Sequence, residues 1–137
     1  MKNVFCFIIL GILSALCLAQ SSNISGDTIT VVSSSAFSVG DKLLIIQMQG
    51  ATINETNTSN FGDITNMNGA GNYEFNTICE IPSSTEIIVN EIQQTYNTTG
   101  MVQVVYVPVY NDAIITASLT AAAWNGLTGG ILAFECL

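Results

Sequence analysis

The clearest alternation of apolar and polar residues lies between Tyr73 and Ile81, where the chain reads YEFNTICEI. A repeat of two is the period of a β-strand, because successive side chains point to opposite faces of a sheet. The alternation predicts one apolar face, made of Tyr73, Phe75, Cys79 and Ile81, and one solvated face, made of Glu74, Asn76 and Glu80.

Short runs rich in β-branched residues recur through the rest of the chain and are separated by turn-forming residues. Turns are predicted at Ser38–Asp41, at Asn97–Gly100 and between Trp124 and Gly130. Helical periodicity does not stand out after the first nineteen residues. We therefore predict an all-β fold: a sandwich, a barrel or a solenoid. Its further strands are expected at Thr28–Val32, Lys42–Gln49, Thr85–Asn90, Val102–Val109, Ala113–Leu119 and Ile131–Cys136.

The first nineteen residues have the layout of a secretory signal peptide. A single Lys2 precedes an apolar run from Val4 to Leu18, and the small Ala19 stands before Gln20. The run of about 15 residues is short for crossing a hydrocarbon core, although an uncleaved membrane anchor is the alternative. We expect cleavage after Ala19, secretion to the cell surface or the medium, and no membrane span in the mature chain.

The charge balance excludes several classes of function. The chain of 137 residues carries ten acids, two lysines, no histidine and a formal net charge of −8. Both basic residues, Lys2 and Lys42, are lysines, so the chain has no arginine. Without histidine it cannot build a Ser-His-Asp or Cys-His catalytic site, and without arginine it lacks the bidentate phosphate clamp. The negative charge repels nucleic acid, which we exclude as a partner.

The stretch from Asn54 to Asn72, NETNTSNFGDITNMNGAGN, is the longest polar segment and the obvious place to look for a metal site. A helix–loop–helix calcium register through Asn66 and Asn68 would put Ile64 and Phe75 at ligand positions, where neither can bind the ion. An irregular calcium site remains open. The simpler interpretation is an exposed, mobile loop, because Asn and Gly hydrogen-bond their own main chain and tolerate left-handed backbone.

The cysteines do not form a recognisable motif. Cleavage after Ala19 would leave Cys79 and Cys136, without any C-x-x-C pair that would indicate zinc binding or redox chemistry. Their places in the alternation predict that both point into a core. We expect a pair of buried free thiols, and a disulfide between them, which export would allow, is the alternative.

Three segments resemble a family of known proteins: VGDKLLIIQMQGATI, FGDITNMNGAGNYEFNTI and VQVVYVPVYNDAIITASLTAAAWNGLTGGILAFE. Together they span roughly Phe37 to Glu135 and resemble the N-terminal region of large secreted surface proteins of gliding Gram-negative bacteria. Those gliding motility-associated proteins end in a sorting domain for type IX secretion. The resemblance implies a surface or extracellular location, and it implies that the segment matching Trp124–Glu135 leads into a parallel β-helix. It implies no site residues.

Two functions other than that of a scaffold are considered, and both involve carbohydrates: hydrolysis of a polysaccharide and binding of a sugar. Paired carboxylates of a glycosidase could come from four acids, Glu74, Glu80, Glu86 and Glu91, and a sugar ring could stack on Trp124, Tyr106 or Tyr110. Acids that alternate along a strand are more typical of a solvated face, and a lone tryptophan beside a turn is more often part of a core.

The sequence as a whole predicts an acidic, non-catalytic module of an exported adhesin-like or scaffold protein, without cofactor, metal or catalytic residues. A carbohydrate-binding or carbohydrate-active module of a secreted β-helix protein is the alternative. Surface polysaccharide or other envelope proteins are the partners that fit. The expected organisation is a signal peptide at 1–19, a compact antiparallel β-module at 20–110, and at 111–137 the first strands of a solenoid or second β-layer, cut short as in a fragment. Because that end leaves Ile131, Leu132, Phe134 and Leu137 as an apolar edge, we expect the isolated mature chain to associate.

Overall fold

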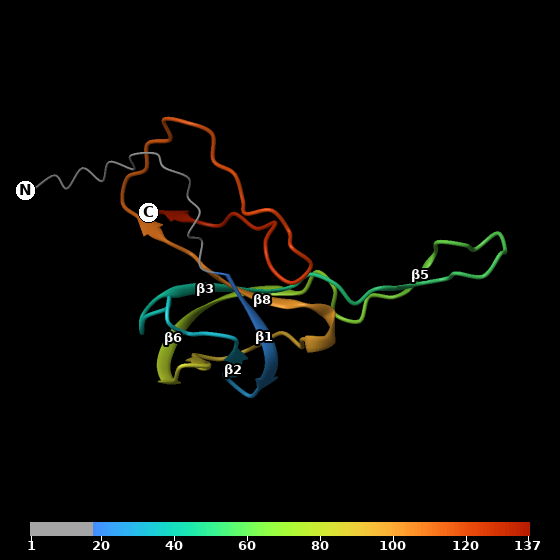
Figure 1. Cartoon of the computed structure of the whole chain (residues 1–137), viewed down its shortest axis with the longest axis horizontal. Coiled ribbons are helices and arrows are strands. Elements are labelled where there is room, and N and C mark those ends of the chain that lie inside the picture. The colour runs from blue at the N-terminus through green and yellow to red at the C-terminus, as the bar shows by residue number, and fades with distance from the viewer. Residues whose placement is uncertain (1–17) are drawn as a thin grey trace, which may run out of the picture.

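The computed structural model describes residues 18–137, and within that range nearly all regular structure is β-strand (Figure 1). The first seventeen residues, and with them most of the predicted signal peptide, lie outside the described part. The elements are β1 Leu18–Ser25, β2 Thr28–Val31, β3 Lys42–Gln47, β4 Thr52–Ile53, β5 Ile64–Asn66, β6 Tyr73–Ser83, β7 Glu86–Val89, the 3-10 turn η1 Thr98–Gly100, β8 Val102–Tyr106, β9 Val109–Tyr110 and β10 Glu135–Cys136.

Six of these strands form a closed barrel in the order β1-β2-β7-β6-β3-β8, in which every neighbouring pair is antiparallel. The barrel closes where Leu18 and Ala19 of β1 pair with Val105 and Val104 of β8. The prediction of an all-β fold with an antiparallel module is confirmed. The strand β1 was not predicted. It begins at Leu18, inside the apolar stretch interpreted as a signal peptide, and that stretch shows no separate pattern that indicates a paired strand.

The barrel interior is filled by the alternate aliphatic residues of all six strands. β-branched side chains suit these positions because they pack well on a pleated surface. The buried residues of this core are Ala19, Ile29, Val31, Phe37, Leu43, Ile45, Ile78, Ile87, Val89, Val102 and Val104.

A second apolar cluster lies on the outside of the barrel. Leu44, Val105 and Val107 form it, and the partly buried Ile131 and Ala133 of the C-terminal segment pack against it. Burial of this outer face holds the C-terminal segment against β3 and β8. An ion pair supports the same contact, with Lys42 Nζ 2.6 Å from Glu135 Oε2.

The C-terminal segment differs from the prediction in its secondary structure. Ala113–Leu119 forms no strand, and of Ile131–Cys136 only Glu135–Cys136 pairs. That short strand, β10, lies parallel to β9, and the chain between them makes a wide excursion beside the barrel (Figure 1). Apolar residues such as Ile114 and Ile115 are 63% and 58% exposed, because no neighbouring strand is available to cover them. A continuation into a solenoid remains a prediction.

The orientation of the first part of β6 is opposite to the prediction. Tyr73 and Phe75 are 59% and 53% exposed, whereas Asn76 and Ile78 are buried. Beyond the bulge that follows Ile78, Glu80 is exposed and Ile81 packs against the core, as predicted. Asn76 can be inside because its side chain is fully paired: Nδ2 donates to the Glu91 carbonyl at 2.8 Å, and Oδ1 accepts from the backbone N–H of Asn90 at 3.1 Å. A satisfied amide removes the penalty that normally keeps asparagine at the surface.

Candidate functional site

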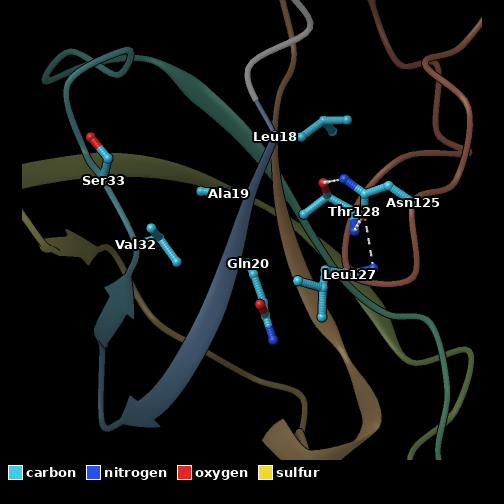
Figure 2. A pocket seen from close by; sticks show the side chains of 8 residues that line it. All are labelled: Leu18, Ala19, Gln20, Val32, Ser33, Asn125, Leu127 and Thr128. Atoms are coloured by element: carbon cyan, nitrogen blue, oxygen red, sulfur yellow. Dashed lines mark hydrogen bonds between the residues drawn. The ribbon is translucent and has the colours of Figure 1, made fainter.

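A groove opens beside the seam of the barrel, between the start of β1, the segment that follows β2 and a turn of the C-terminal segment (Figure 2). Its volume is about 260 Å³. The lining contains no charged side chain and consists of Leu18, Ala19, Gln20, Val32, Ser33, Asn125, Leu127 and Thr128. Such a groove suits an uncharged ligand that combines an apolar body with hydroxyl or amide groups.

The turn that forms one wall of the groove is held by two side chains. Asn125 Oδ1 accepts hydrogen bonds from the backbone N–H of Leu127 at 2.9 Å and of Thr128 at 2.8 Å. Gln103, which is fully buried on β8, clamps Gly129 from below: its Oε1 accepts from the Gly129 N–H at 2.8 Å, and its Nε2 donates to the Gly129 carbonyl at 3.2 Å. The turn is therefore pre-ordered against the barrel.

The groove also includes the predicted cleavage point. Leu18 and Ala19 line it, and Ala19 is in addition a buried member of the barrel core. Cleavage after Ala19 would shorten β1 to Gln20–Ser25. The pairs Gln20 with Gln103 and Ser21 with Val102 would then close the barrel.

The Asn54–Asn72 segment forms most of a long arm that projects from the barrel (Figure 1). Nearly all of its side chains are exposed or half-exposed, as predicted, and two short strands, β4 and β5, pair within it. Its asparagines serve the local backbone: Asn54 Oδ1 accepts from the Thr56 N–H, and Asn66 Oδ1 accepts from the Asn68 N–H, both at 2.9 Å. The interpretation of these residues as loop formers is confirmed.

The arm is tied to the barrel at its base by Gln47, a fully buried residue at the end of β3. Gln47 Nε2 donates to the carbonyls of Gln49 at 2.7 Å and Asn68 at 2.8 Å, and Oε1 accepts from the Asn97 N–H at 2.8 Å. Glycines surround this amide, because a Cβ atom at any of them would collide with it; they are Gly50, Gly69 and Gly100. Neither buried glutamine, Gln47 nor Gln103, was predicted to be buried, although a glutamine inside the apolar run VQVVY is itself a signal.

The four candidate acids differ in exposure and in hydrogen-bond partners. Glu80 and Glu91 are exposed, and Glu86 Oε2 accepts from the Ser83 hydroxyl at 3.0 Å. Glu74 is half-buried, contrary to the prediction of a solvated position, and its Oε2 accepts from the Gln93 N–H at 3.0 Å. Burial, together with the charge of Glu74, raises the pKa of Tyr96 well above its ordinary value.

Metal-ligating residues do not gather in the described part of the chain: between 18 and 137, no three of His, Cys, Asp and Glu lie close enough to hold an ion. Glu55 and Asp63, the acids of the arm, are exposed. Over the same residues, no helix has the length and apolar character needed to cross a membrane.

The cysteine prediction was wrong about burial. Cys79 and Cys136 are both exposed free thiols. Cys79 Sγ donates to Asn90 Oδ1 at 2.8 Å, and Cys136 Sγ lies 3.8 Å from the Asn111 carbonyl oxygen. Cys79 is outside because its neighbour Ile78 takes the interior position on β6.

The three predicted aromatic candidates differ in exposure. Trp124 is exposed, at 37%, whereas Tyr106 and Tyr110 are half-buried. The open pair is Tyr73 and Phe75, whose ring centres lie 6.4 Å apart in an edge-to-face arrangement. Lys42 Nζ lies 5.5 Å from the centre of the Phe75 ring, close enough for a cation–π contact.

No family model, no curated protein and no solved structure matches this chain. The interpretation of its function therefore depends on the groove, the arm and the exposed aromatic pair.

Proposed function

We propose that this chain is a non-catalytic module of an exported cell-surface or extracellular protein, and that it acts as an adhesin-like or scaffold element. The projecting arm carries the proposal. It leaves four large apolar side chains in solvent, Ile53, Phe61, Ile64 and Met67, which are 49%, 66%, 62% and 51% exposed. Exposed apolar groups on a segment held only at its base are typical of a surface that meets a macromolecule.

Export is supported by the sequence of residues 1–19, and it has a direct test. The full chain is expressed in a Gram-negative host, and the intact mass of the protein outside the cytoplasm is measured. We expect a chain that begins at Gln20. Material outside the cytoplasm that retains Met1 would contradict the proposed signal peptide.

Adhesion is tested by coating beads with the protein and measuring their retention on an envelope fraction and on surface polysaccharide from a gliding Gram-negative bacterium. Beads coated with a variant in which Phe61 and Met67 are both changed to Ser should be retained much less than wild-type beads. The matched control changes Val39, 64% exposed and outside the arm, to Ser. Equal retention of all three coatings would refute an adhesive role for the arm.

A carbohydrate-binding module is the second candidate, and the exposed Tyr73–Phe75 pair favours it. Aromatic rings stack on sugar faces, and the neighbouring Lys42–Glu135 ion pair offers a donor and an acceptor to sugar hydroxyls. Binding to a glycan array that is lost in Tyr73→Ala and kept in Phe61→Ala would support it. Release of reducing sugar from a polysaccharide would instead establish a carbohydrate-active enzyme.

A further inference from the structure

The arm has free strand edges. Every strand of the barrel has two neighbours, so the barrel has no edge. In the rest of the described chain, β4 and β5 of the arm each have one neighbour, as do β9 and β10 of the C-terminal segment. Natural proteins protect free edges with lysine, proline or a covering segment. Between residues 50 and 72 the sequence contains neither lysine, arginine nor proline.

The two strands of the arm do not pack against any apolar surface: all five residues of β4 and β5 are exposed. At its base the arm is held by the hydrogen bond from Gln47 Nε2 to the Asn68 carbonyl. Its distal part is held by hydrogen bonds within its own turns. A two-stranded hairpin without a third strand or a packed face is marginally stable in water. Additional strands from a partner would both cover the free strand edges and extend the hairpin into a larger, more stable sheet.

We propose that the arm pairs with the arm of a second copy of this chain, β5 against β5 in antiparallel orientation, which gives a four-stranded sheet across a two-fold axis. An antiparallel pair of identical strands is self-complementary, and it closes as a dimer. This goes beyond the proposed function, because it assigns a partner and a register to the arm independently of export.

The register follows from the residues. With the two-fold axis at Thr65, each Thr65 lies opposite its counterpart, Ile64 lies opposite Asn66, and Asp63 lies opposite Met67. No acid then faces another acid directly, which matters in a chain of net charge −8 because directly opposed like charges destabilise a sheet. Threonine pairs and β-branched residues are favourable in such cross-strand positions.

The test measures the mass of the full chain, purified in whichever form a secretory host leaves it, by sedimentation velocity over a range of concentrations. Wild type should sediment as a dimer, and Ile64→Lys as a monomer. Val39→Lys is the matched control, because Val39 and Ile64 are both β-branched and are 64% and 62% exposed, and both changes add the same charge. A monomeric wild type, or a dimer that survives Ile64→Lys, would overturn the proposal.

A cross-link tests the register. With the four native cysteines changed to Ser, Thr65→Cys should form a disulfide-linked dimer on mild oxidation, because directly opposed Cβ atoms lie about 4.5–5.5 Å apart, near disulfide range. Ser59→Cys, at the exposed tip of the arm, should not. If the protein is a dimer but the Thr65→Cys variant does not cross-link, arm-to-arm pairing is refuted. The contact would then lie at the C-terminal apolar edge or in the groove.

Discussion

The clamp between Gln103 and Gly129 makes a prediction that can be worked out in detail. Gln103→Leu keeps the volume of the buried side chain and removes both of its hydrogen bonds to Gly129, itself a buried residue. The N–H and C=O of Gly129 would then be buried without partners. Each such group costs about 1–3 kcal/mol, so we expect the two together to remove about 2–6 kcal/mol from the free energy that holds the turn on the barrel.

The assay is urea unfolding followed by two signals. Trp124 is the single tryptophan and lies in the clamped segment, so its fluorescence reports undocking, while far-ultraviolet circular dichroism reports the barrel. For a slope of about 1–3 kcal/mol per M, a loss at the lower limit of about 2 kcal/mol already lowers the fluorescence midpoint of Gln103→Leu by about 0.7–2 M. The dichroism midpoint should fall less if the turn leaves before the barrel opens.

The control is Gln94→Leu, the same substitution at an exposed glutamine. It should leave both midpoints close to those of the wild type, since surface changes are usually worth less than about 0.5 kcal/mol. If the two variants unfold at the same urea concentration, the Gln103 clamp does not hold the segment and the reasoning is refuted.

Three further predictions follow from single contacts. Gly69→Ala should destabilise the arm base by about 1–3 kcal/mol more than Gly62→Ala, because both have positive φ but a Cβ at Gly69 would lie 2.6 Å from Gln47 Oε1; equal urea midpoints would contradict this. Cys79 and Cys136 should both react with a thiol reagent in the native, non-reduced protein, and a requirement for denaturant would contradict their exposure. Because burial and Glu74 raise the pKa of Tyr96 above the unfolded value of 10.0, its contribution to stability is present below about pH 10 and is lost as the pH rises toward the folded pKa. Tyr96→Phe should therefore abolish the latest step of the alkaline tyrosine absorbance titration, and an unchanged profile would argue against the shift.

Local chemistry was enough to predict five of the six β-strands of the barrel, all except β1. Lys42–Gln49 and Thr85–Asn90 were recognisable because β-branched runs lie between turn residues, and the structure places β3 and β7 inside those bounds. The exposed Asn54–Asn72 segment was equally predictable from its many asparagine, glycine and threonine residues. These are properties of a few neighbouring residues, and they need no knowledge of what packs where.

The tertiary structure decided which face of each strand is inside. On β6 the alternation is compatible with either face, and a bulge after Ile78 breaks the period. Asn76 could take the interior only because Asn90 and Glu91, fourteen and fifteen residues away, supply its partners. The same is true of Gln47 and Gln103, which contact segments 50 and 26 residues distant. The sequence shows where these polar side chains stand along the chain. Their hydrogen-bond partners come close to them only when the barrel has closed, so their burial could not be predicted from the sequence pattern.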